Sequence, residues 1–299
     1  MPERRSSLLD IDLVDLGGQR LRTAVGGARQ APRTLLLFNG IGANLETMAP
    51  FMARFVRTRV IAFDVPGVGG SPLPKAPYRM RSVAALGACL LDHFGIAQAH
   101  AFGVSWGGAA AQEFALRHTE RCRTLTLAAT TSGFPVVPGR PRVLLELLSP
   151  RRYLDPGHLV RVGGRLYGGA LRLERDLLEM HAEAMRDPSR LGYGLQLLAI
   201  AGWTSWPRLH RLRLPALVLA GADDPIVPPI NGRIVAAQLR HARLETIDCG
   251  HLFVLTRPGE TAARVEAFLE AHPGEAPTVP SPVPARPGTG RPRARSRRR

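Results

Sequence analysis

Cysteine is scarce in this 299-residue sequence. The three cysteines, Cys89, Cys122 and Cys249, stand at unrelated spacings, which match neither a disulfide framework nor a zinc motif. A disulfide-stapled domain and a zinc module are therefore excluded as explanations of the fold. We expect the three side chains to be small buried or half-buried groups.

Long apolar runs are also missing. No run approaches the roughly 18 residues that a membrane-spanning helix requires. The N-terminal segment has the arginines but not the apolar core of a signal peptide, because Asp10, Asp12 and Asp15 interrupt it. We therefore expect a cytoplasmic protein with no transmembrane segment. Its composition, 45% hydrophobic and 21% charged residues, is typical of a globular domain.

Lysine is nearly absent, which affects how the net charge of +16 is interpreted. Lys75 is the only lysine among 40 basic residues, and GC-rich codon usage explains this skew more easily than phosphate recognition does. Seven arginines follow Ala271, against one acid in that segment: Arg286, Arg291, Arg293, Arg295, Arg297, Arg298 and Arg299. The remaining excess is scattered and has no aromatic-interleaved basic motif. We expect no nucleic-acid binding by the folded domain, and the partner of the tail stays unknown.

Segments with a strand-like pattern alternate along the chain with segments with a helical pattern. Short apolar runs without internal alternation are typical of strands in a parallel sheet covered on both faces. The runs are Thr34–Phe38, Val60–Phe63, Ala99–Phe102, Leu125–Ala129 and Leu217–Ala220, and Leu244–Ile247 is a further strand candidate. The helical patterns are Arg79–His93, Trp106–His118, Asn231–Leu239 and Pro258–Ala271. This alternation predicts an α/β fold with a mostly parallel central sheet covered by helices.

Three other segments depart from this alternation. Ile11–Leu16 and Arg20–Ala24, joined by two glycines, predict an antiparallel hairpin at the sheet edge. Residues 133–210 show no strand pattern and are too long for a plain loop, so we predict a helical cap inserted between two strands. Residues 272–299 hold seven prolines and no aromatic residue, which predicts a disordered tail after a single domain over residues 1–271.

The motif with the clearest chemistry is Gly103-Val104-Ser105-Trp106-Gly107, which lies between a predicted strand and a predicted helix. A G-x-S-x-G at that junction is typical of a nucleophilic serine on a strained turn, where side chains two residues away would clash. The following helix would direct its N-terminal amides at an oxyanion. The pattern alone is weak, and its context is what favours a catalytic serine over an ordinary glycine-rich turn.

A nucleophilic serine needs a base and an orienting acid, in the chain order serine, acid, histidine. His251 lies in a loop after a predicted strand, at the carboxyl end of the sheet, where α/β folds place their sites. Two aspartates, Asp223 and Asp224, lie in the loop after Leu217–Ala220. In this fold the acid usually stands three residues after the loop glycine, which favours Asp224 and leaves Asp223 as a solvated or loop-capping carboxylate.

Backbone amides would donate hydrogen bonds to the oxyanion of the tetrahedral intermediate. The loop Phe38–Gly42 follows a predicted strand and contains glycines that let the backbone approach a substrate, so the candidate donors are the amides of Ile41 and Trp106. A plain turn is the alternative for this loop. The glycine-rich segment Asp64–Ser71 lacks the spacing of a dinucleotide loop, and we predict that it shapes the pocket wall.

With these motifs in place, the chain resembles the intracellular poly(3-hydroxyalkanoate) depolymerases of medium-chain-length type, a family with the α/β-hydrolase fold. The resembling segments are LLLFNGIGANLE (35–46), VIAFDVPGVGGSP (60–72), FGVSWGGAAAQEFA (102–115), SPRRYL (149–154), LAIAGWTSW (198–206), LVLAGADDPIVP (217–228) and IDCGHLFVLTR (247–257). The family match assigns Ser105, Asp224 and His251 to a catalytic triad. The Pro/Arg tail has no counterpart in this resemblance.

The resemblance implies hydrolysis of an intracellular storage polyester through an acyl-enzyme on Ser105, with release of 3-hydroxy fatty acids and no cofactor or metal. It also implies contact with an insoluble granule. Five cap aromatics are candidates for that contact and for a gate, with ordinary cap core as the alternative: Tyr153, Tyr167, Tyr193, Trp203 and Trp206. The leucine-rich stretch Leu191–Ile200 would form a deep apolar pocket for medium-length side chains.

Three other functions are alternatives to polyester hydrolysis. A soluble carboxylesterase or lipase acting on small acyl esters would use the same triad. A non-catalytic granule-coat or nucleoid-tethering protein could use the arginine tail, but it would have no need of three aligned catalytic groups. Dehalogenase or epoxide-hydrolase chemistry is disfavoured, because it needs an aspartate at the position of Ser105.

Overall fold

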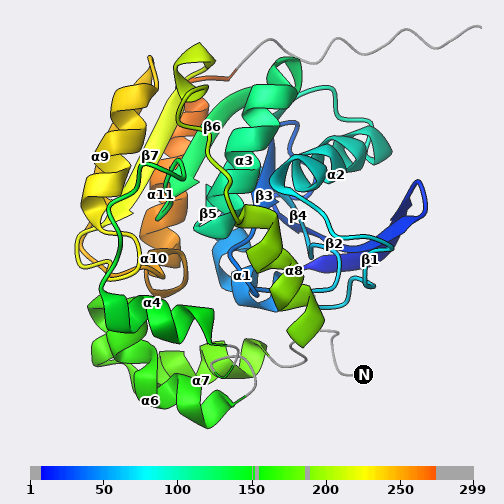
Figure 1. Cartoon of the computed structure of the whole chain (residues 1–299). Coiled ribbons are helices and arrows are strands. Elements are labelled where there is room, and N and C mark those ends of the chain that lie inside the picture. Colours follow the sequence, from blue (N-terminus) through cyan, green and yellow to red (C-terminus); the bar gives the residue numbers. More distant parts are fainter. Residues whose placement is uncertain (1–7, 150, 152–154, 186–188, 274–299) are drawn as a thin grey trace, which may run out of the picture.

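The computed structural model describes residues 8–149, 151, 155–185 and 189–273. Within these residues a central sheet is covered by helices on both faces, and a group of helices lies beyond one end of the sheet (Figure 1). The predicted disordered tail, apart from its first two residues, and the predicted cap residue Tyr153 lie outside the described residues.

The sheet has eight strands in the order β1-β2-β4-β3-β5-β6-β7-β8. They are β1 Asp10–Leu16, β2 Gln19–Gly27, β3 Thr34–Phe38, β4 Arg59–Phe63, β5 Ala99–Val104, β6 Cys122–Ala128, β7 Ala216–Gly221 and β8 Ala242–Ile247. β1 and β2 form the predicted edge hairpin, β2 pairs antiparallel with β4, and all later neighbours pair in parallel. The predicted α/β fold with a mostly parallel sheet is confirmed.

Helices bury both faces of the sheet. One apolar core joins the sheet to α2 Met80–His93, α3 Trp106–Arg117 and α9 Pro229–Gln238. A second joins its other face to α1 Leu45–Met52, α10 Phe253–Thr256 and α11 Pro258–Glu270. β3, β5 and β7 are buried along their whole length, as expected for strands with helices on either side.

Between β6 and β7 the chain forms α4 Pro141–Leu148, α6 Pro156–Tyr167, α7 Arg175–Ala184 and α8 Arg190–Ile200. We call α4, α6 and α7 the cap helices; they lie below the sheet in Figure 1 and share a small core of their own. α8 is different, because Leu195 and Ala199 pack into the main core while Tyr193 packs into the cap core. It therefore connects the cap helices to the main domain.

Two details differ from the sequence expectations. α1 was not predicted, because it is short and contains Pro50; it is held at its start by Asn44, whose side chain accepts a hydrogen bond from the Thr47 amide at 3.2 Å. Cys122 and Cys249 are buried as expected, but Cys89 is exposed. Cys89 lies on the solvent side of α2, between the buried residues Ala88 and Leu90.

Candidate active site

Ser105 lies at the sharp turn from β5 into α3. Its φ of 53° and ψ of −120° are unusual for a residue other than glycine. Three hydrogen bonds hold the strained turn. The Ser105 amide donates to the Ala128 carbonyl at 2.9 Å, and the Ser105 carbonyl accepts from the Thr130 hydroxyl at 2.7 Å and from the Gly108 amide at 2.9 Å. Strain of this kind persists where the surroundings over-determine it, which is common at reactive side chains.

The glycines on either side of Ser105 are required by close backbone approach. A Cβ on Gly103 would lie 2.4 Å from the carbonyl oxygen of Gly107, and a Cβ on Gly107 would lie 2.1 Å from that of Phe38. Both distances are too short for any side chain. The spacing of the motif thus follows from β5, α3 and the loop after β3 meeting at one point.

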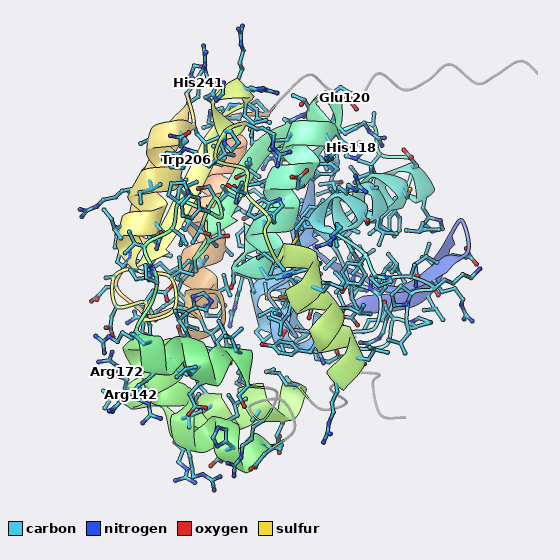
Figure 2. The ribbon with its side chains drawn as sticks, in the orientation of Figure 1. His118, Glu120, Arg142, Arg172, Trp206 and His241 are labelled. Carbon is cyan, nitrogen blue, oxygen red and sulfur yellow. The ribbon has the colours of Figure 1, made fainter. Side chains whose placement is uncertain are left out.

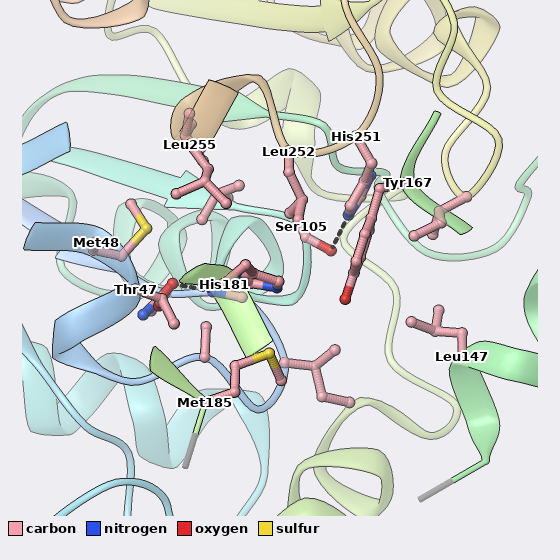
Figure 3. A pocket seen from close by; sticks show the side chains of 17 residues that line it. Thr47, Met48, Ser105, Leu147, Tyr167, His181, Met185, His251, Leu252 and Leu255 are labelled. Carbon is pink, nitrogen blue, oxygen red and sulfur yellow. Dashed lines mark hydrogen bonds between the residues drawn. The ribbon is translucent and has the colours of Figure 1, made fainter. Parts of the chain in front are cut away.

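The three residues predicted as a triad come together at this turn. His251 Nε2 lies 3.0 Å from Ser105 Oγ, and His251 Nδ1 lies 2.7 Å from Asp224 Oδ2. Figure 3 shows the imidazole of His251 pointing at the Ser105 hydroxyl. His251 and Asp224 are buried, while Ser105 is half-buried and lines a pocket.

The Asp224 carboxylate is fixed in place by its own loop. Its Oδ1 accepts hydrogen bonds from the amides of Ile226 and Val227, both at 2.9 Å, which leaves Oδ2 directed at the imidazole. Because an aspartate accepts the Nδ1 proton, the neutral imidazole presents Nε2 to Ser105 as an acceptor. This arrangement is able to take a proton from the serine hydroxyl.

The neighbouring Asp223 has a different role. Its Oδ2 accepts the amide of Gly169 at 2.9 Å and pairs with the Arg172 guanidinium at 2.8 Å. Both partners follow α6, and Figure 2 shows Arg172 at the surface beside the cap helices. Asp223 therefore links the loop of Asp224 to the cap helices, and it is not directed at His251.

The two predicted oxyanion donors come from two segments that meet at Ser105, the loop after β3 and the start of α3. Trp106 begins α3, and amides in the first turn of a helix have no acceptor within it. Ile41 lies in a turn closed by a hydrogen bond from the Ala43 amide to the Gly40 carbonyl at 3.2 Å, with Gly42 at φ 69°. Ile41 and Ser105 line the same pocket.

That pocket contains about 580 Å³ of empty space, part of it open to solvent. Its wall is mostly apolar and is contributed by α1, α4, α10 and the ends of α6 and α7. Figure 3 shows Met48, Leu147, Met185, Leu252 and Leu255 around the Ser105 hydroxyl. Two polar rings also line it, those of Tyr167 and His181. No local sequence pattern marks His181 as a pocket residue, because its position depends on how α7 packs on α1.

Two predictions about the pocket wall are wrong. Residues 64–71 do not line the pocket, because Asp64 is turned toward the start of α1, where it accepts the Leu45 amide at 2.9 Å and pairs with Arg22. Burial raises the pKa of Asp64 to about 6. The stretch Leu191–Ile200 does not line the pocket either, since the apolar side of α8 packs mainly on the main core.

The four cap aromatics that the structure describes do not form an outer contact surface. Tyr167 and Tyr193 are buried in the core of the cap helices, although Tyr167 also lines the pocket. Trp203 is half-buried, and its indole donates to Glu113 at 3.0 Å. Figure 2 shows Trp206 beside the main domain and away from the cap helices. These positions favour the alternative interpretation, in which the aromatics are packing residues.

Within the described ranges, no group of three histidine, cysteine, aspartate or glutamate side chains is arranged to hold a metal ion. None of the described helices combines the length and the apolar character needed to span a bilayer.

A family model described as alpha/beta hydrolase fold matches residues 33–258. This chain belongs to the alpha/beta hydrolase fold family. The hydrolase is also 47% identical over 271 residues to the poly(3-hydroxyalkanoate) depolymerase of Ectopseudomonas oleovorans, a match that spans 90% of this chain and 96% of that protein. The predicted family and the predicted class of enzyme, an ester hydrolase, are thereby confirmed.

More distant similarities agree with the fold. A 3-oxoadipate enol-lactonase from Acinetobacter baylyi is 28% identical and matches 81% of this hydrolase and 90% of its own length. The crystal structure of an enol-lactonase from Burkholderia xenovorans superposes with a TM-score of 0.75 at 27% identity, covering 87% of this hydrolase and 100% of that chain.

Proposed function

We propose that this hydrolase cleaves the ester bonds of a poly(3-hydroxyalkanoate) with medium-length side chains through an acyl-enzyme on Ser105, releasing 3-hydroxy fatty acids. The hydrogen-bonded series Asp224–His251–Ser105 carries the proposal of a serine nucleophile. The 47% identity to a poly(3-hydroxyalkanoate) depolymerase supports the polyester as substrate.

The mechanism follows from the geometry of the site. His251 Nε2 accepts the Ser105 proton as Oγ attacks the ester carbonyl, and the buried Asp224 stabilises the imidazolium that forms. The amides of Ile41 and Trp106 donate to the tetrahedral oxyanion. His251 then protonates the leaving 3-hydroxyl group. A water molecule, activated by the same imidazole, cleaves the acyl-enzyme and frees the acid.

The apolar wall of the pocket supports a preference for longer side chains. Each methylene group that leaves water contributes about 0.8 kcal/mol. Met48, Leu147, Met185 and Leu255 offer such a surface close to Ser105. A pentyl side chain on each monomer unit can therefore contribute more to binding than a methyl group does.

Exposed leucines beside the pocket support contact with an insoluble polymer. Leu145 and Leu148 of α4 are 69% and 57% exposed, and Leu147 between them lines the pocket. An apolar surface at the rim suits an enzyme that works at the surface of a polyester granule. We propose a cytoplasmic, granule-associated enzyme.

The similarity to an enol-lactonase structure favours one alternative, hydrolysis of small soluble esters or lactones. The two functions are separated by incubating the enzyme with amorphous granules of poly(3-hydroxyoctanoate) and of poly(3-hydroxybutyrate), and measuring the free 3-hydroxy acids. We expect faster release from the octanoate polymer and none from the Ser105→Ala protein. Hydrolysis of p-nitrophenyl esters without release of 3-hydroxy acids from either polymer would support a serine esterase and rule out the polyester as its substrate.

A further inference from the structure

Gln196 of α8 makes contact with both segments that would supply the oxyanion donors. Its side chain is buried, with the residue 1% exposed, and its Oε1 accepts a hydrogen bond from the Gly42 amide at 2.8 Å. Its main-chain carbonyl accepts a hydrogen bond from the indole Nε1 of Trp106 at 2.9 Å. One residue of α8 thus binds the loop after β3 and the start of α3 at the same time.

The bond to Gly42 fixes the orientation of a peptide that would otherwise be able to rotate. The positive φ of Gly42 and the hydrogen bond from Ala43 to Gly40 define a tight turn whose central peptide joins Ile41 to Gly42. The Asn39 side chain accepts the Gly40 amide at 2.8 Å. The amides on both sides of Ile41 are therefore engaged, one by Asn39 and one by Gln196.

The bond to Trp106 acts on the other half of the site. Trp106 follows Ser105 directly, and its side chain is buried in the main core. Holding the indole against α8 restrains the first residue of α3, whose amide points toward the developing oxyanion in the proposed mechanism.

We propose that Gln196 is a positioning residue for the hydrolysis: it sets the distance between the Ile41 and Trp106 amides by holding both segments against α8. This proposal rests on the proposed serine mechanism. It assigns to α8 a part in transition-state stabilisation, although α8 does not line the pocket. Since oxyanion donors act only if they are aligned in advance, a small displacement is expected to lower kcat and leave KM nearly unchanged.

The test uses two variants of similar side-chain length. Gln196→Met removes the acceptor, whereas Gln196→Glu keeps an oxygen that can accept from Gly42. The matched control is Ser189→Ala, which removes the N-cap of α8, where the Ser189 side chain accepts the Gly192 amide at 2.9 Å, without touching the loop or Trp106. For each full-length protein, kcat and KM for p-nitrophenyl octanoate are measured per active site counted with a fluorophosphonate, together with the inhibition constant of an alkylboronic acid.

We expect Gln196→Met to lower kcat about 10- to 100-fold and to keep KM within about threefold of the wild type. Binding of the boronic acid should weaken in parallel, because its adduct with Ser105 resembles the tetrahedral intermediate. At the acid end of the pH profile, the kcat of Gln196→Glu should exceed that of Gln196→Met. As the pH rises and the introduced carboxyl ionises beside the oxyanion loop, the kcat of Gln196→Glu should fall relative to the wild type. Ser189→Ala should lower the melting temperature and leave kcat unchanged.

Two results would overturn the positioning role. One is a Gln196→Met protein with unchanged kcat per active site and only a lower melting temperature. The other is a rise in KM with kcat and boronic acid affinity retained. Failure of the serine mechanism itself is recognised separately, because the wild-type protein would then not react with the fluorophosphonate.

Discussion

The main-chain amide of His251 donates a hydrogen bond to the carbonyl oxygen of Tyr167 at 2.7 Å. Tyr167 is the last residue of α6, so the backbone of a cap helix is bonded directly to the histidine beside Ser105. The next residues approach equally closely: a Cβ on Gly169 would lie 2.0 Å from the Gly250 amide nitrogen. The cap helices and the histidine loop are therefore packed as one unit, and the position of His251 depends on both.

Enlarging residue 250 tests this dependence. A Cβ there would lie 2.1 Å from the Tyr167 carbonyl oxygen, so Gly250→Ala must push the loop and α6 apart. We expect a loss of about 1–3 kcal/mol in the free energy of unfolding and a lower kcat, because His251 moves away from Ser105. Denaturant unfolding and ester hydrolysis measure the two effects.

The control for this substitution is Gly259→Ala in α11, where a Cβ would meet no atom within 4 Å. It should leave kcat unchanged and alter stability by less than about 1 kcal/mol. Wild-type kcat in a folded Gly250→Ala protein would show that His251 is positioned without the help of α6.

The two adjacent aspartates should differ sharply. Asp224→Asn removes the acceptor that fixes the imidazole tautomer, and the corresponding change in a serine protease lowers kcat on the order of 10⁴-fold. Asp223→Asn keeps an oxygen for the Gly169 amide and loses only an exposed ion pair with Arg172, so kcat should stay within about threefold. The measurement is kcat of both proteins on one ester under steady-state conditions. A larger loss of kcat in Asp223→Asn than in Asp224→Asn would assign the orienting role to Asp223.

Stability should fall in mild acid because of His100 on β5. Its ring is buried, with Nδ1 2.8 Å from the Thr124 hydroxyl, and burial together with Arg123, Arg33 and His272 lowers its pKa to about 3. The unfolded chain protonates this histidine below about pH 6.5, whereas the folded chain does not, so its contribution is lost as pH falls from 6.5 toward 3. His100 by itself lowers the free energy of unfolding by about 2 kcal/mol between pH 8 and pH 5. Asp64, whose pKa burial raises to about 6, offsets part of this loss, because the folded state protonates it before the unfolded state does.

The experiment follows the free energy of unfolding against pH for the wild type and for His100→Gln. Below pH 6.5 the wild type should lose stability relative to the variant, since the variant lacks the group that the unfolded state protonates. His93→Gln, at an exposed position on α2, should keep the wild-type slope. Parallel curves for the wild type and His100→Gln would mean that other groups cause the dependence on pH.

The sequence predicts the sheet and the serine turn well, for a physical reason. Strands covered on both faces are mostly apolar, and the glycines beside Ser105 are forced by backbone contact, so both leave a strong local pattern. Asp224 and His251 can be found because each follows a strand at the carboxyl end of the sheet.

The parts that were missed depend on contacts between distant segments. The role of Gln196 arises from packing of α8 against residues about 90 and 154 positions away. α8 was assigned to the pocket because its sequence is rich in leucine, but the main core buries that face. Asp64 was assigned to the pocket wall, and instead it holds the start of α1. No local pattern distinguishes these outcomes.

The most direct test of the serine mechanism is to trap the acyl-enzyme during turnover of the proposed substrate. A linear oligomer of 3-hydroxyoctanoate is mixed with the wild-type enzyme, quenched in acid within the first turnover, and the digested protein is examined by mass spectrometry. We expect a 3-hydroxyacyl adduct on the peptide that contains Ser105, and no adduct on the Ser105→Ala protein, which should also lose about 10⁶-fold in kcat. Turnover of the oligomer with an adduct on another residue, or undiminished turnover by Ser105→Ala, would contradict it.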